Sequence, residues 1–108
     1  MIVIKSIMGL IGLAKRAGKL SSGESACKEA IKTGKSYLII LAEDVGKNTG
    51  KNILDSCNFY NVKHLIIGTK ESLGHAVGND YNAVLSVNDE GFANGILKKY
   101  PANINEGE

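Results

Sequence analysis

The sequence predicts an α/β protein in which helices cover both faces of a small sheet of about four strands. Two continuous apolar runs, at 37–42 and 65–67, are too short for buried helices and indicate central strands. Segments with apolar residues three or four positions apart alternate with these runs and indicate amphipathic helices. A length of 108 residues with 44% hydrophobic residues allows one globular domain at 1–100, followed by a polar tail at 101–108.

The first helix is predicted to run from the N-terminus to Gly18, a residue type that often ends helices. Gly9 and Gly12 weaken this helix, so we expect another backbone to approach closely at both positions. One face of the helix carries its apolar residues, which are Ile4, Ile7, Met8, Ile11 and Ala14.

A brief strand at 19–22 leads into a second helix. Ser21 and Glu24 fit a capping box at its start, with Ser22 as the alternative N-cap. Gly34 ends this helix, and the strand at 37–42 follows.

In the second half, a helix at about 51–60 is expected to bury Ile53, Leu54, Cys57 and Tyr60. The strand at 65–67 follows, and Thr69 is expected to cap a short helix that stops at Gly78. Another strand at 83–87 precedes a last helix, for which Asn88 is the predicted N-cap.

Charge is unevenly distributed along the chain. Residues 1–35 hold seven basic and two acidic residues, whereas 36–108 hold six basic and nine acidic ones. This asymmetry favours a surface that faces a polyanion, although a solvated basic face without a partner explains it equally well. Two cysteines thirty residues apart exclude a disulfide scaffold and indicate a reducing, cytoplasmic location. No signal peptide or membrane-spanning segment is expected.

Three groups of residues are candidates for a chemical site, and none of them predicts an enzyme, a metal site or a cofactor. The loop at 46–52 resembles a phosphate loop but has three residues between its glycines where the motif needs four. Glu43 and Asp44 are neighbours in an extended chain and would point to opposite sides. Cysteine–histidine chemistry is not favoured either, because both cysteines fall on apolar helix faces.

A basic strip is the fourth candidate. Lys15, Arg16 and Lys19 stand at the end of the first helix, and Lys28 and Lys32 lie on the exposed side of the second. Between them, the start of the second helix offers free N–H groups and a favourable dipole for a phosphate. The clustering favours RNA binding, while each residue alone is explained by capping or by a solvated helix.

Three phrases of the sequence resemble the kink-turn RNA-binding ribosomal protein superfamily of the L-seven-Ae type, in particular its small bacterial YlxQ branch. They are IGLAKRAGKLSSGE at 11–24, LIILAEDV at 38–45 and GTKESLGHAVG at 68–78. The DEGFA phrase at 89–93 adds to the likeness, which covers about residues 3–100. The resemblance implies a three-layer α/β/α sandwich with a mixed four-stranded sheet, and a non-catalytic protein that binds sharply bent RNA.

The resemblance also implies which residues contact RNA. The glycine at the start of the second helix is kept as Gly23, whereas Ser25, Ala26 and Glu29 stand at the family's Asn, Glu and Lys positions. Ala26 offers no hydrogen bond to a base, and Glu29 repels phosphate, so weakened kink-turn specificity is expected. Tyr81 follows the helix that ends at Gly78 and is a candidate for stacking on an unpaired base.

The sequence therefore predicts a monomeric protein that binds structured RNA, with ribosomal RNA as one candidate partner, and neither DNA nor membrane. The alternatives are a protein-binding adaptor on the same fold and, more remotely, a nucleotide site at Gly46–Lys51. The candidate RNA-binding residues are Lys15, Arg16, Lys19, Ser22, Gly23, Ser25, Ala26, Lys28, Lys32 and Tyr81.

Overall fold

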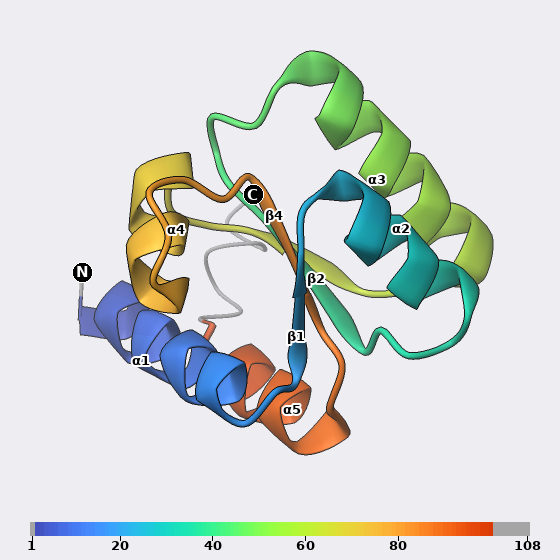
Figure 1. The fold of residues 1–108 in the computed structure, drawn as a ribbon. Helices are drawn as coiled ribbons and strands as arrows, with labels where there is room; N and C mark the ends of the chain where they lie inside the picture. The colour runs from blue at the N-terminus through green and yellow to red at the C-terminus, as the bar shows by residue number, and fades with distance from the viewer. Residues whose placement is uncertain (1, 101–108) are drawn as a thin grey trace.

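The computed structural model describes residues 2–100, with side chains from residue 5 onward. Helices and strands alternate along this part of the chain as the hydrophobic pattern predicts (Figure 1). In chain order they are α1 (Ile2–Arg16), β1 (Leu20–Ser22), α2 (Glu24–Lys32), β2 (Leu38–Leu41), α3 (Lys47–Tyr60), β3 (His64–Ile66), α4 (Lys70–Val77), β4 (Val84–Val87) and α5 (Glu90–Lys99). The predicted polar tail at 101–108 and the Ile4 side chain lie outside the described residues.

The strands form one mixed sheet in the order β1-β4-β2-β3. β2 and β3 are parallel, whereas β4 is antiparallel to both β1 and β2. Leu38 lies opposite Val87, and Leu41 lies opposite Val84. The sheet therefore has a Val84 end, where β1 and β2 finish and β4 begins, and a Val87 end, where β1 and β2 begin and β4 finishes.

Helices cover the sheet on both sides, which confirms the three-layer sandwich. α1, α4 and α5 lie on one face, and α2 and α3 lie on the other (Figure 1). Alternate side chains of β2 enter the two cores: Leu38 and Ile40 pack under α1, α4 and α5, while Ile39 and Leu41 pack under α2 and α3. All four are fully buried, as predicted for a central strand.

The start of α3 differs from the prediction, because this helix begins at Lys47 and not near 51. Gly46 is its N-cap, and Gly50 is buried in the first turn, where an added Cβ would lie 3.3 Å from Val45 Cγ1. Glycine is needed here for close packing and does not mark a loop. Because the segment is helical, it forms no open phosphate loop, and the remote nucleotide-site alternative loses its basis.

Two predicted caps are wrong. Gly23, with φ of +91°, is the N-cap of α2 and makes no side-chain cap bond, so the predicted Ser21–Glu24 capping box is absent. α5 is capped by Asp89, whose carboxylate accepts a hydrogen bond from the Phe92 N–H at 2.9 Å. The serine and asparagine predicted as caps serve the sheet, because the Asn88 side-chain amide donates to Ser21 Oγ at 2.9 Å. The predicted Thr69 cap of α4 is confirmed as a full capping box.

Two packing predictions are also wrong. Tyr60 was expected in the core but is 42% exposed, because it lies on the last turn of α3 beyond the part that packs on the sheet. At Gly12 an added Cβ would lie 3.2 Å from the Ala76 carbonyl oxygen, which confirms the expected close approach to α4. At Gly9, one turn earlier in α1, nothing lies within 4 Å of an added Cβ, so the predicted close approach of another backbone is wrong there.

Candidate nucleic-acid interface

The N-terminus of α2 opens at the Val84 end of the sheet. Gly23 follows the edge strand β1 directly, and its N–H donates to the Val84 carbonyl oxygen at 3.1 Å. Its φ of +91° turns the chain from strand into helix in one residue, a conformation that favours glycine. Ser25 and Ala26 are exposed in the first turn, while Ser22 and Gly23 are partly exposed. With no side-chain cap at Gly23, the first-turn N–H groups remain available to a ligand.

The loop that carries Tyr81 lies at the same end. The carbonyl oxygen of Ala83, two residues on, accepts a hydrogen bond from the Ala42 N–H at 2.9 Å, which joins the loop to the end of β2. Gly74 of α4 packs against the loop, where an added Cβ would lie 2.7 Å from Asp80 backbone atoms. Tyr81 is 69% exposed. The structure thus brings Tyr81 and Gly23 to one end of the sheet, although 58 residues separate them in the sequence.

The basic residues at and just after the end of α1 lie away from the Gly23 turn. Lys15, Arg16 and Lys19 are exposed and precede β1, so they lie at the Val87 end. The Lys19 carbonyl oxygen accepts a hydrogen bond from the Asn88 N–H at 2.8 Å, which fixes this position beside the end of β4. The three residues of β1 place them about 10 Å from the start of α2. The basic strip expected from the sequence is therefore interrupted by the edge strand.

Lys28 and Lys32 face a different surface, a groove between α2 and α3. Together with Ser25 and Glu29 they line a hollow of about 390 Å³ whose opposite wall is formed by Ser56 and Tyr60 of α3. These positions are spaced three to four residues apart on each helix, so each set lies on one helical face. The groove leads away from the Gly23 turn, toward the Val87 end.

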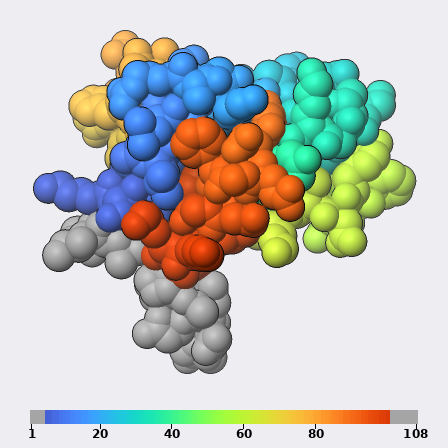
Figure 2. All heavy atoms as spheres, turned by 90° about the horizontal axis from the view of Figure 1, so that it is seen from below, coloured from blue at the N-terminus to red at the C-terminus, as the bar shows by residue number. Residues whose placement is uncertain are grey.

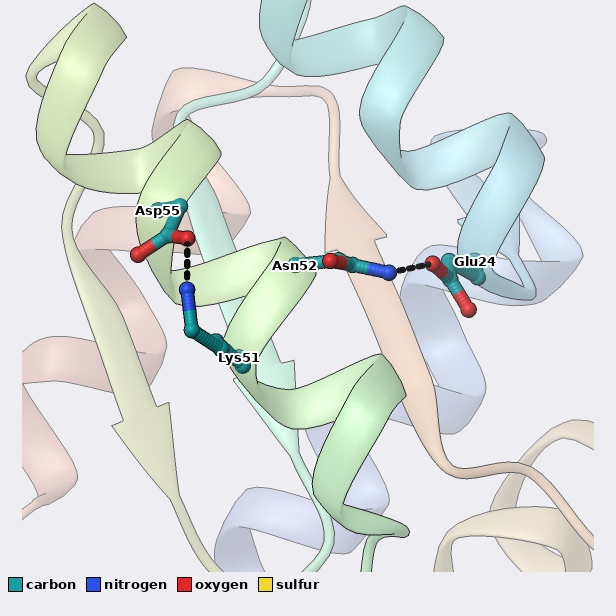
Figure 3. Close-up of polar contacts among 4 residues, drawn as sticks. All are labelled: Glu24, Lys51, Asn52 and Asp55. Carbon is teal, nitrogen blue, oxygen red and sulfur yellow. Dashed lines mark hydrogen bonds and ion pairs between the residues drawn. The ribbon is translucent and has the colours of Figure 1, made fainter.

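A polar contact that the sequence does not reveal joins the start of α2 to α3, and Figure 3 shows its Glu24–Asn52 part. The Glu24 carboxylate accepts hydrogen bonds from the Thr49 hydroxyl at 2.8 Å and from the Asn52 side-chain amide at 3.0 Å. These two bonds, the Asn52 bond foremost, lower the pKa of Glu24. Thr49 and Asn52 are three residues apart, so the sequence could place both polar side chains on one face of a helix. Nothing in the sequence identifies Glu24 as their partner.

The residues considered for catalysis have structural roles. Cys27 is buried between α2 and the sheet, and Cys57 is buried between α3 and the sheet. Burial raises the pKa of the Cys27 thiol to about 12 and that of the Cys57 thiol to about 11. The Asp44 carboxylate accepts a hydrogen bond from the Lys70 N–H at 2.8 Å. Among residues 2–100, no three His, Cys, Asp or Glu side chains gather closely enough to hold a metal ion. No helix in that range is long and apolar enough to cross a membrane.

Comparisons with known proteins bear on this arrangement. "RNA-binding protein YlxQ" of Bacillus subtilis is 38% identical over 88 residues, which span 82% of this chain and 88% of that protein. "Large ribosomal subunit protein eL8" of Cenarchaeum symbiosum is 25% identical over 94% of this chain and 82% of its own length.

Solved structures show the same fold. A protein of unknown function from Bacillus halodurans C superposes with a TM-score of 0.83 and 34% identity, covering 86% of this chain and 94% of its own. The Giardia lamblia 15.5kD RNA binding protein superposes with a TM-score of 0.75 at 19% identity, covering 92% of this chain and 85% of its own, and bears on the fold alone. The family model described as "Ribosomal protein L7Ae/L30e/S12e/Gadd45 family" matches residues 5–96, and the chain belongs to that family.

Proposed function

We propose that this chain is a non-catalytic, ribosomal-protein-like protein of the cytoplasm that binds structured RNA as a monomer, with ribosomal RNA as one candidate. The observation that carries the proposal is the meeting of the uncapped α2 N-terminus at Gly23 with the exposed Tyr81 loop. A helix N-terminus suits a phosphate, and an exposed tyrosine suits an unpaired base. Relatives named as RNA-binding and ribosomal proteins support the same conclusion.

Kink-turn specificity is weakened in this proposal. Ala26 and Glu29 are exposed on α2 at the positions where the family resemblance places a base-reading Glu and a phosphate-facing Lys. Alanine has no hydrogen-bonding group for a base edge, and a carboxylate repels phosphate. Lys28 lies about 100° round the helix from Glu29 and replaces the missing charge only in part. Non-specific phosphate contacts then supply a larger share of the affinity.

Charge reversal tests the proposal. Lys15 and Lys19 lie at the Val87 end, about 10 Å from the start of α2, a distance that the phosphate backbone of a structured RNA spans. We expect Lys15→Glu with Lys19→Glu to weaken binding of a structured RNA and to lower the slope of log K against log salt by about 1.4 to 1.8. Both side chains are exposed, so the melting temperature should be nearly unchanged. Lys98→Glu with Lys99→Glu, two exposed lysines of α5, is the matched control. Binding that survives the first pair as well as the second would remove these residues from the site.

The adaptor alternative predicts a different result in the same experiment. A protein partner held mainly by apolar contacts would not show the steep salt dependence of phosphate binding. If the chain binds no structured RNA at low salt, while a protein partner binds with little salt dependence, the RNA proposal fails.

A further inference from the structure

The Val87 end of the sheet holds a second groove that the proposed RNA site does not use. It encloses about 450 Å³ and is lined by the end of α2, the segments before β2 and β3, and the start of α5. Figure 2 looks onto this end, where the teal, yellow-green and orange segments meet. Lys32 and Tyr60 line both this groove and the one between α2 and α3, so the two grooves adjoin.

Aromatic rings are concentrated and exposed here. Tyr37 is 47% exposed and Tyr60 is 42% exposed, and both line the groove. Phe59 is 80% exposed and contacts Tyr60 edge to face, with ring centroids 4.8 Å apart. Three of the chain's six aromatic residues therefore remain at the surface in one region, where they do not contribute to either core. Exposed rings are the platforms on which single-stranded bases stack.

The charges differ between the two ends of the sheet. At the Val87 end, Lys32 and Lys63 line the groove, and Lys19 and Lys35 lie in exposed segments. Two carboxylates oppose these four lysines there: Glu90, which lines the groove, and Asp89 beside it. The Val84 end carries more acidic residues in the segments that flank its strands: Glu24, Glu43, Asp44 and Asp80. A polyanion is therefore attracted more strongly to the end opposite the α2 N-terminus.

A protein partner fits this groove less well than a nucleic acid does. Protein interfaces favour arginine and deplete lysine and glutamate, whereas every basic side chain that lines the two grooves is lysine. Asn61 stands beside Tyr60 in a left-handed conformation, with φ of +63°, and its amide offers both a donor and an acceptor to a base edge. Tyrosine, lysine and asparagine together match the recognition of unpaired bases.

We propose that the Val87 groove binds single-stranded RNA, with bases on Tyr37 and Tyr60 and phosphates along Lys32 and Lys63. Lys28, in the adjoining groove between α2 and α3, extends this row of lysines. This inference rests on the proposed function, because it assigns the groove to an unpaired segment of the RNA that the Val84 end holds by its folded part. The groove between α2 and α3 lies between the Val84 end and the Val87 groove, since its lining extends from Ser25 to Tyr60.

The test uses the full chain labelled with ¹⁵N and two separate probes, octauridylate and a blunt kink-turn hairpin. We expect octauridylate to shift the amide signals of Lys32, Tyr37, Tyr60 and Val62. Tyr37→Ala and Tyr60→Ala should each weaken octauridylate binding about fivefold to a hundredfold. Tyr37→Phe with Tyr60→Phe keeps the stacking faces and should retain the affinity, which excludes a merely structural effect.

Leu13→Ala is the control, because it removes an exposed side chain of α1 that lines neither groove and should leave octauridylate binding unchanged. If the hairpin binds but octauridylate moves none of the groove amides, the inference fails and the proposed function stands. If neither probe binds, both fail. If octauridylate alone binds in the groove, the groove is a single-stranded RNA site, but the proposed structured-RNA function fails and so does the assignment of the groove to an unpaired segment of a folded RNA. Groove signals that shift only with protein concentration would overturn the inference in favour of contact between copies of the chain.

Discussion

The Glu24 carboxylate at the start of α2 accepts a hydrogen bond from the side-chain amide of Asn52 in α3 at 3.0 Å (Figure 3). A second bond, from the Thr49 hydroxyl, joins the same two helices. The nearby Lys51–Asp55 pair is different in kind, because it lies within α3 and both side chains are more than 60% exposed. Such a pair contributes little to stability, whereas the Glu24 contacts set how α2 enters the candidate interface.

Glu24 should make stability depend on pH. Its pKa is lowered in the folded chain, so its contribution is present above the ordinary value of 4.5 and is lost as pH falls through the folded-state pKa. We expect Glu24→Gln to lower the melting temperature at pH 7 and to match the original chain in strong acid. Glu71→Gln is the matched control, because Glu71 also lies in the first turn of a helix. If the difference in melting temperature between Glu24→Gln and the original chain is the same at all pH values, this role of Glu24 is contradicted.

Gly74 should be intolerant of a side chain. An added Cβ would lie 2.7 Å from the Asp80 carbonyl carbon and oxygen, so the Tyr81 loop must move. We expect Gly74→Ala to lower the free energy of unfolding by about 1–3 kcal/mol in denaturant titrations.

Gly9→Ala is the comparison for Gly74→Ala, because nothing lies within 4 Å of its added Cβ in α1. There, alanine should raise the free energy of unfolding by about 0.5–1 kcal/mol through helix propensity. Equal effects of the two substitutions would mean that the Tyr81 loop does not press on α4.

The two cysteines should be inert in the folded chain. Burial raises the pKa of Cys27 to about 12 and that of Cys57 to about 11, so almost no thiolate is present at pH 8. We expect a thiol reagent to label neither residue in native buffer and to label both in guanidinium chloride. Rapid native labelling of either cysteine would show that α2 or α3 opens from the sheet.

The order of elements could be predicted from hydrophobic period alone, because β2 is apolar throughout and the helices repeat every three to four residues. The start of α3 could not be predicted, because a glycine such as Gly50 usually indicates a loop. Only the structure shows that Gly50 lies in a helix and packs closely against Val45. The interruption of the basic strip could not be predicted for a similar reason. Residues close in sequence, such as Lys19 and Gly23, lie at opposite ends of an edge strand, and local spacing does not reveal the strand's direction.

The most direct test of the central claim compares kink-turn affinity between the original chain and a triple variant at one fixed salt concentration. Ser25→Asn, Ala26→Glu and Glu29→Lys restore the side chains that the family resemblance assigns to RNA reading, at three exposed positions of α2. A bidentate base contact contributes on the order of 1–3 kcal/mol, so the variant should bind about tenfold to a hundredfold more tightly. Nanomolar binding by the original chain, or no gain in the variant, would contradict the account.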